Sequence, residues 1–171
     1  MLRLRPYKKC DAKYVVSWIK DEQTFKKWSA NRINKYPITA EDLNAHYAEQ
    51  DENEAFFVMS AFDETGVVGQ MLMRFLDEDK KILRFGFIIV DDSKRGKGYG
   101  KGMLSLAIKY ATDILKVEKI TIGVFDNNMP AYNCYKSLGF VEIPEKSEIY
   151  RMGDEDWKCL EMEMEICQVC S

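Results

Sequence analysis

A glycine-rich basic segment restricts the fold of this chain most, because it separates an apolar run ending at Val90 from a helical pattern starting near Met103. The segment reads Arg95-Gly96-Lys97-Gly98-Tyr99-Gly100-Lys101-Gly102 and follows Lys94. Glycine adopts backbone conformations that other residues avoid, and it lets a ligand approach the main chain closely. A helix that begins here offers free N–H groups and the positive end of its dipole. The segment therefore predicts a strand, a phosphate-binding loop and a helix in succession.

Two well-known phosphate-binding loops do not match this segment. A Walker loop has glycine at the position of Arg95 and serine or threonine at the position of Gly102. A dinucleotide fingerprint has its third glycine where this chain has Lys101 or Met103, depending on the register. The mismatches argue against nucleotide hydrolysis and against a dinucleotide cofactor.

The pattern Arg95-x-x-Gly98-x-Gly100 resembles the acyl-CoA pyrophosphate loop of the GCN5-related N-acetyltransferase family, written Q/R-x-x-G-x-G/A. Basic glycine-rich turns also occur as plain connections between elements, so the six residues are modest evidence alone. They favour the family and need a second motif.

That second motif lies downstream, after a buried strand predicted over residues 119–125. It resembles the family signature N-x-x-A-x-x-x-Y-x-x-x-G-F, with the matching positions taken by Asn128, Ala131, Tyr135, Gly139 and Phe140. Gly139 also suits a helix cap and Phe140 a core position. The spacing from Asn128 to Tyr135 has no such structural reason, and it makes the resemblance specific.

The resemblance implies an acetyl-CoA-dependent N-acetyltransferase that acts, without a metal, on the primary amine of a small molecule or a protein N-terminus. The amine would attack directly in a ternary complex. Tyr135 would protonate the departing thiolate, and Asn128 would orient the pantetheine arm or a water molecule. The residues implied in cofactor binding are Ile88, Ile89, Val90, Arg95, Gly96, Lys97, Gly98, Tyr99, Gly100, Lys101, Asn128 and Tyr135.

The general base is where this chain departs from the family pattern. Many members carry a glutamate on the strand before the loop, but residues 82–90 contain no carboxylate. An alkylamine with a pKa of about 10.4 must still lose a proton before it attacks. We expect water to relay that proton to a distant carboxylate; Asp126 and Glu142 flank the site in sequence but suit turn or surface positions better. His46, the single histidine, is expected to be a solvated helix residue.

The acceptor is not identified by these motifs. The first residues resemble the branch of the family that includes ribosomal-protein N-terminal and small-amine acetyltransferases, and residues 29–39 would set acceptor specificity. Glu41 and Asp42 would attract a cation or, as we favour, serve as charges at the start of a helix. A non-catalytic acyl-CoA sensor is the alternative function, and a homodimer is one expected assembly.

Composition limits the other function classes. A chain of 171 residues suits one N-acetyltransferase domain over residues 1–171, with the last few as a mobile tail. A net charge of −3 disfavours nucleic acid and anionic membranes as partners. Without an apolar span or a signal peptide, a cytoplasmic protein is expected. The five cysteines suit free thiols; Cys167 and Cys170 have half of a zinc-site spacing with no second pair.

Hydrophobic periodicity predicts the fold class, which is α/β (α+β). Strands are expected over residues 2–6, 55–62, 67–75, 81–90, 119–125 and 160–166. Helices are expected after Asp11, near residues 21–28 and after Thr39, then one that starts near Met103 and a last one that ends at Leu138. We expect Tyr14, Val15, Trp18 and Ile19 to face one side of the first helix, and Ile114 to be a core residue of the helix after the loop. The resulting order β-α-α-β-β-β-α-β-α-β-β resembles that of the acetyltransferase family, and this resemblance implies a mixed, mainly antiparallel sheet. It would be splayed in the middle by a bulge in residues 87–90 and flanked by helices.

Overall fold

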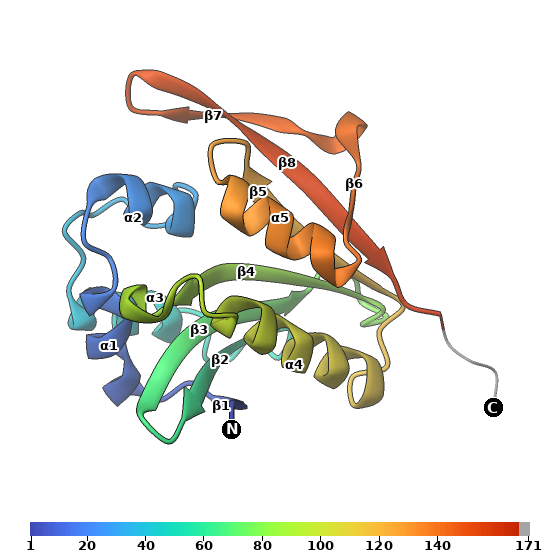
Figure 1. Ribbon diagram of the computed structural model, residues 1–171, viewed down its shortest axis with the longest axis horizontal. Helices are drawn as coiled ribbons and strands as arrows, with labels where there is room; N and C mark the ends of the chain where they lie inside the picture. Colours follow the sequence, from blue (N-terminus) through green and yellow to red (C-terminus); the bar gives the residue numbers. More distant parts are fainter. Residues whose placement is uncertain (168–171) are drawn as a thin grey trace.

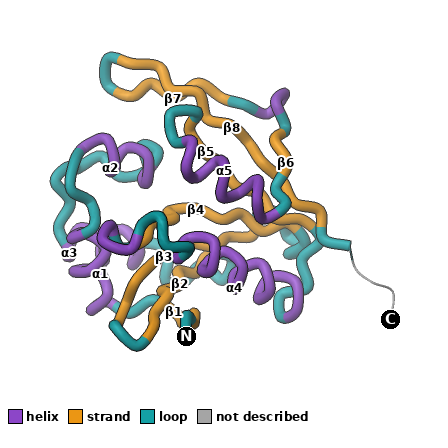
Figure 2. Tube along the Cα trace, viewed as in Figure 1, coloured by secondary structure: helices purple, strands orange, loops and turns teal. Residues whose placement is uncertain are grey.

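The computed structural model describes residues 1–167 and contains one continuous sheet flanked by helices (Figures 1 and 2). The strand order is β1-β2-β3-β4-β5-β8-β6, with β7 paired to β8. All pairings are antiparallel except β4 with β5. This confirms the predicted α+β class with a mixed, mainly antiparallel sheet.

The first quarter of the chain begins with one short strand and is otherwise mostly helical. It comprises β1 (Arg3–Pro6), a 3-10 turn (Lys9–Asp11), α1 (Ala12–Ser17), α2 (Glu22–Ser29) and α3 (Ala40–Ala48). The Asp21 carboxylate accepts the Thr24 N–H at 2.7 Å to begin α2, and the Thr39 hydroxyl accepts the Asp42 N–H at 3.1 Å to begin α3. The three helices expected after Asp11, near residues 21–28 and after Thr39 all form, so the predicted element order, which had two helices here, is one helix short.

Two details of α1 were predicted wrongly. Tyr14 is exposed, whereas Val15, Trp18 and Ile19 are buried as expected. The Asp11 side chain does not cap α1, because it is itself buried and accepts hydrogen bonds from Arg5 and other neighbours. A six-residue helix has too few turns to bury four side chains on one face.

A meander of three strands forms the centre of the sheet, as predicted. It consists of β2 (Phe56–Asp63), β3 (Gly66–Phe75) and β4 (Ile82–Val90). Leu72 pairs with Gly86 and Gln70 pairs with Ile89, so β4 has an extra residue between these two pairs. Phe87 takes a φ of 48° there, which is the bulge that the family resemblance implied.

The sheet opens beyond this bulge. β5 (Lys119–Phe125) pairs with β4 only from Ile82↔Lys119 to Phe85↔Ile122. Strand β8 (Glu155–Glu165) pairs with β5 along its whole length and with β6 (Val141–Glu142) and β7 (Glu148–Met152). In Figure 1, β4 and β8 converge at the right and diverge toward α2. The last strand thus begins earlier than predicted and belongs to a three-strand segment rather than to a two-strand one.

The helix after the glycine-rich segment begins at Tyr99, not near Met103. A 3-10 turn (Asp92–Lys94) precedes it, and α4 (Tyr99–Asp113) includes Gly100 and Gly102 in its first turn. Glycine is a poor helix former, so the periodic pattern became visible only after this turn. The helix also ends before Ile114, which is 66% exposed rather than part of the core.

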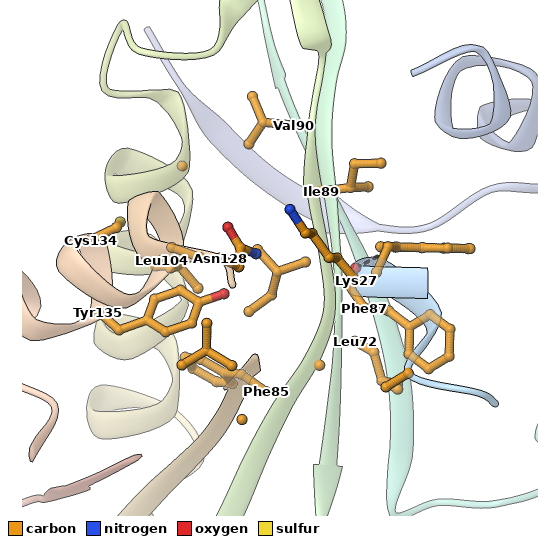
Figure 3. A pocket seen from close by; sticks show the side chains of 18 of the residues that line it. Lys27, Leu72, Phe85, Phe87, Ile89, Val90, Leu104, Asn128, Cys134 and Tyr135 are labelled. Atoms are coloured by element: carbon orange, nitrogen blue, oxygen red, sulfur yellow. Dashed lines mark hydrogen bonds between the residues drawn. The ribbon is translucent and has the colours of Figure 1, made fainter. Parts of the chain in front are cut away.

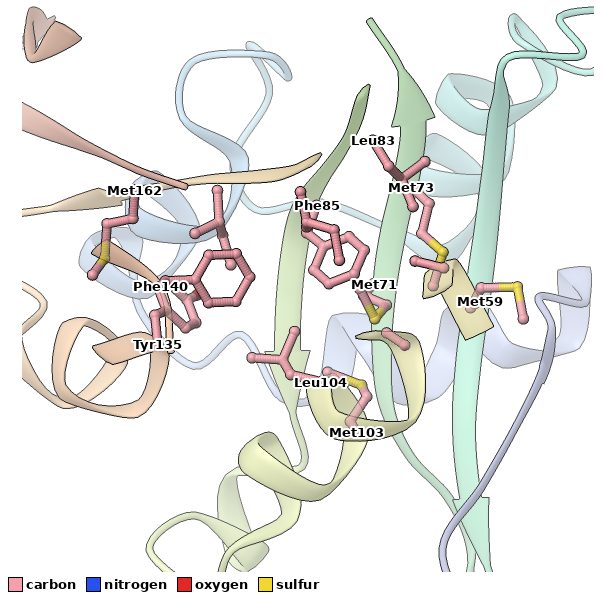
Figure 4. Packing of buried hydrophobic residues seen from close by; sticks show 14 of the residues in the cluster. Met59, Met71, Met73, Leu83, Phe85, Met103, Leu104, Tyr135, Phe140 and Met162 are labelled. Atoms are coloured by element: carbon pink, nitrogen blue, oxygen red, sulfur yellow. The ribbon is translucent and has the colours of Figure 1, made fainter. Parts of the chain in front are cut away.

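A methionine-rich core lies between the sheet and helices α4 and α5 (Met129–Leu138). Figure 4 shows Phe85, Leu104, Tyr135 and Phe140 packed together, and the buried methionines of this cluster are Met59, Met71, Met73, Met103 and Met162. Unbranched methionine side chains fill the irregular space under a sheet that is not flat. A second cluster holds α1–α3 against the other face of the sheet and includes Ile89.

No helix within residues 1–167 is both long and apolar enough to cross a bilayer. The remaining 3-10 turn is Pro144–Lys146, between β6 and β7. A single domain over residues 1–171 stays a prediction.

Candidate active site

A cavity of about 1100 Å³ lies where β4 and β5 part, bordered by α2, α4 and α5 (Figure 3). Strand β4, the glycine-rich segment and α5 all contribute lining residues. Of the twelve residues implied in cofactor binding, eleven line this cavity. Lys97 does not, because its ammonium is turned back to the Ser93 carbonyl at 3.2 Å.

The cavity-facing edge of β4 has no strand partner beyond Phe85 within the part of the chain that the structure describes. Ile88, Ile89 and Val90 line the cavity from this edge. Backbone N–H and C=O groups at such an edge need partners. An elongated ligand with amide groups, such as a pantetheine arm, fits this edge by the same chemistry as an added strand.

The glycine-rich segment supplies the second wall. Gly96 and Gly98 have φ angles of 74° and 84°, which L side chains rarely adopt, and Gly98 is the residue just before α4. The first N–H groups of α4 have no partner within the helix, and no described side chain caps them, so an anion is favoured beside them. Lys94, Arg95 and Lys101 line the cavity. The Lys94 ammonium already contacts Thr65 at 2.7 Å and Asp63 at 3.9 Å.

Tyr135 and Asn128 lie together on the opposite wall. Asn128 precedes α5, but its side chain makes no capping bond, so the amide is free for another partner. Figure 3 shows the Tyr135 hydroxyl and the Asn128 amide pointing into the same space beside β4. Burial raises the pKa of Tyr135 above its ordinary value, so its hydroxyl keeps its proton at neutral pH. The pair can therefore offer two hydrogen-bond donors in a confined place.

No aspartate or glutamate lines the cavity among residues 1–167. Glu142 accepts the Tyr132 hydroxyl at 3.0 Å, and Asp126 is exposed in the turn after β5. Asp42 completes the capping box of α3 and pairs with Lys35 at 2.8 Å, which fits the favoured role of a helix charge. No carboxylate among the described residues of this site can accept the proton directly, and the expected relay through water to a distant carboxylate stays a prediction.

His46 lines the cavity instead of standing in solvent, which corrects the expectation from sequence. Its ring lies 5.7 Å from the ring of Phe87, the residue at the bulge. Burial lowers the pKa of His46, against a smaller opposing effect of Glu49, so the imidazole is neutral at pH 7. His46 follows Leu43 by three positions and precedes Tyr47, both buried; this helical spacing was the signal available in the sequence.

A group of basic side chains lines the end of the cavity away from the loop, and sequence reasoning missed it. Its members are Arg32 after α2, Arg74 on β3 and Arg84 on β4, whereas Lys27 on α2 points to the middle of the cavity, beside Asn128 and Ile89 (Figure 3). Nearby, the Trp28 indole donates to the Phe87 carbonyl at 3.1 Å and so fastens α2 to the bulge. These residues come from separate elements, so no motif connects them.

No group of three metal-ligating side chains occurs within residues 1–167. Cys10, Cys134, Cys159 and Cys167 are free thiols, as predicted. Cys170, the other half of the zinc-like spacing, lies outside the described residues.

A sheet that opens beside a basic glycine loop, with a protonated tyrosine on the facing helix, is the arrangement of an acyl-CoA-dependent transferase. Residues 15–140 match the model of the acetyltransferase (GNAT) family, and the chain belongs to that family. It is an N-acetyltransferase that uses acetyl-CoA.

Individual relatives are distant. The chain is 24% identical over 161 residues to an N-acetyltransferase 9-like protein of Nematostella vectensis, covering 86% of this chain and 78% of that one. Over 66 residues it is 35% identical to spermine/spermidine N(1)-acetyltransferase of Bacillus subtilis, covering 37% of this chain and 43% of the relative. A crystal structure of spermidine N-acetyltransferase from Vibrio cholerae in complex with CoA and spermine superposes with a TM-score of 0.81 at 19% identity, covering 96% and 95% of the two chains. That likeness shows the fold.

Proposed function

We propose that this protein transfers the acetyl group of acetyl-CoA to a primary amine by direct attack in a ternary complex. The observation that carries the proposal is the convergence, in one cavity, of the unpaired β4 edge, the glycine-rich loop and Tyr135. The diphosphate would bind at the loop and the start of α4. The pantetheine arm would lie along β4, with its thioester in the direction of Tyr135.

The chemistry divides among a few groups. The acceptor nitrogen attacks the thioester carbonyl carbon, a C–N bond forms, and the C–S bond breaks. Tyr135 donates its proton to the departing thiolate, and its raised pKa keeps that proton available until sulfur develops charge. Asn128 donates from its uncapped amide to the pantetheine arm or to a bound water.

His46 is the proton acceptor in this proposal. Apart from it, the titratable side chains that line the cavity are Lys, Arg, Tyr and Cys. Burial raises the pKa of Cys134 and of Cys159, which leaves both as thiols. The neutral imidazole of His46 accepts the proton of the attacking amine, directly or through one water molecule.

A panel of amines tests the function. Thiol release from acetyl-CoA would be followed with small amines, amino acids, ribosomal-protein N-terminal peptides and polyamines, the last because two relatives are named for spermine and spermidine. Turnover with at least one amine is the expected result. CoA binding without turnover of any amine would favour the sensor alternative. Sedimentation of the same samples tests the homodimer, which stays a prediction, as does the cytoplasmic location.

A further inference from the structure

The cavity has two separate basic ends. Lys94, Arg95 and Lys101 lie at the glycine-rich loop, after the last residue of β4, whereas Arg84 lies near the first residue of β4. Val90 follows Arg84 by six positions along the strand, a distance of about 20 Å at the usual rise. One diphosphate therefore cannot contact both ends, and the second basic end is available to the acceptor.

At this second end, Arg74 is partly buried and has no partner for its charge among the described residues. It stands opposite Arg84 in the register of β3 and β4. Burial lowers the pKa of the Arg74 guanidinium, and the charges of Arg84 and Arg32 lower it further. Within residues 1–167 it forms no ion pair and no side-chain hydrogen bond. A partly buried guanidinium without a partner is costly, so its place in a cavity suggests a ligand that supplies one.

The neighbours of Arg74 do not supply its missing partner. Arg84 is satisfied by Glu161, whose two carboxylate oxygens lie 2.7 and 3.2 Å from the guanidinium nitrogens. Arg32 has no ion-pair partner among the described residues either. Two uncompensated positive charges, those of Arg74 and Arg32, therefore lie close to each other, and no carboxylate faces them from the described lining.

We propose, on the basis of the proposed function, that the acceptor is an amine carrying an anionic group, a carboxylate or a phosphate, which Arg74 binds with help from Arg32. A polyamine does not suit this end of the cavity, because its second ammonium would meet like charges. The same positive surroundings favour the unprotonated form of the attacking amine. They therefore assist catalysis as well as recognition.

Matched pairs of amines test the proposal. Glucosamine 6-phosphate would be compared with glucosamine, and phenylalanine with its amide, with spermidine as the polycation. Binding to CoA-saturated protein is measured by calorimetry, and kcat/KM by thiol release. We expect at least one anionic member to bind about 10-fold more tightly than its partner without the anionic group, because a charge-assisted hydrogen bond is gained. Equal or tighter binding of the members without the anionic group, or of spermidine, would overturn the proposal.

Substitutions test whether Arg74 causes the discrimination between the amines. Arg74→Gln should remove the discrimination by raising KM for the anionic amine about 10-fold while the KM for acetyl-CoA stays the same, and Arg74→Lys should restore part of it. Arg151→Gln is the matched control, because Arg151 pairs with exposed Asp156 outside the cavity. A thermal melt of R74Q checks that the variant still folds. It should fold, because within the described part of the chain Arg74 forms no ion pair whose loss would destabilise the protein. Discrimination that survives in R74Q would refute the assignment.

The two proposals can fail separately. If spermidine is the best acceptor, acetyl transfer is established and the anionic acceptor is wrong. If an anionic amine binds through Arg74 but no acetyl-CoA is consumed, the recognition stands and the transferase mechanism fails. If no anionic amine binds or is acetylated, the proposal of an anionic acceptor is wrong. Turnover of the other amines then decides whether the protein is an acetyltransferase of another acceptor.

Discussion

Two tyrosines on α5 have different surroundings and therefore different expected roles. Tyr135 is buried and lines the cavity, whereas the Tyr132 hydroxyl donates to Glu142 at 3.0 Å and lies outside the lining. Three positions along one helix separate a hydroxyl that can reach substrate from one engaged in a structural bond. The pair is a built-in comparison between catalysis and packing.

Tyr135→Phe should lower kcat by about 100-fold or more, because general acid catalysis typically contributes that much. Affinity for CoA should be nearly unchanged, since the phenol acts when the thiolate departs. Steady-state kinetics and calorimetry measure the two quantities. Tyr132→Phe is the control and should keep its turnover. A parallel loss of affinity and turnover in Y135F would contradict the role of proton donor.

His46 leads to a prediction about pH. Its lowered pKa lies below the ordinary value of about 6.5, and the neutral form is the active one, so kcat/KM should rise with pH through that pKa and then level off. Glu49 is the charged neighbour that opposes the shift, and Tyr47 is the titratable ring beside it, 5.8 Å away.

His46→Gln should abolish this acidic limb and reduce kcat/KM at neutral pH by about 100-fold. Because His46 is the single histidine of the chain, NMR titration of its ring protons gives its pKa without ambiguity. That pKa should coincide with the kinetic one in the free enzyme. An unchanged pH profile in H46Q would remove His46 from the mechanism.

At the scale of elements, two backbone features shape the connection between β4 and α4. The bulge at Phe87 turns the strand edge toward the cavity, and Gly98 turns the chain into α4. A Cβ added at Gly98 would meet no atom of the chain within 4 Å. The space in front of this glycine is therefore open for a ligand.

Gly98→Val should weaken CoA binding by about 10-fold or more, because a β-branched residue strains at a φ of 84° by about 1–3 kcal/mol and obstructs the diphosphate. Gly153→Val is the control: Gly153 has a φ of 64° in the turn between β7 and β8, outside the cavity. It should lose similar stability but retain its affinity. Calorimetry with CoA and thermal melts separate the two effects, and full affinity in G98V would refute the loop assignment.

At the scale of the whole molecule, a buried carboxylate ties the first strand to the sheet and to α1. Asp11, 1% exposed, accepts from Arg5 at 2.7 and 2.9 Å, from the Ser60 hydroxyl at 2.8 Å and from the Lys8 N–H at 2.9 Å. Burial raises the pKa of Asp11, but these hydrogen bonds outweigh it and hold the pKa below its usual value. These hydrogen bonds anchor the start of the helical layer. Helices α2 and α3, which follow in the chain, complete the cavity.

Asp11→Asn should lower the free energy of unfolding at pH 7 by about 2 kcal/mol, because Arg5 loses its charged partner. The folded-state pKa is lowered, so this stabilisation is complete above the unfolded pKa of about 3.9 and disappears as pH falls through the folded value. Urea denaturation at pH 7 and in acid measures it. Exposed Asp156→Asn should change stability by less than about 1 kcal/mol. A difference between wild type and D11N that is as large in strong acid as at pH 7 would contradict this account.

Local patterns determined much of this protein. The strand, glycine-rich loop and helix, the caps at Asp21 and Thr39, and the spacing from Asn128 to Tyr135 depend on residues close together in the chain. Hydrogen bonds and allowed φ angles act over a few residues, so a sequence states them directly. The position of the opening between β4 and β5 was expected only through resemblance to a family.

The tertiary structure alone decided what faces the opening. Lys27, Arg74 and Arg84 come from α2, β3 and β4, and His46 comes from α3. Their proximity depends on strand register, on the bulge at Phe87 and on the packing of helices against the sheet, each a consequence of many distant contacts. Charge and acidity at the site arise from that convergence, because burial and neighbouring charges, not residue identity alone, set the protonation state of a side chain.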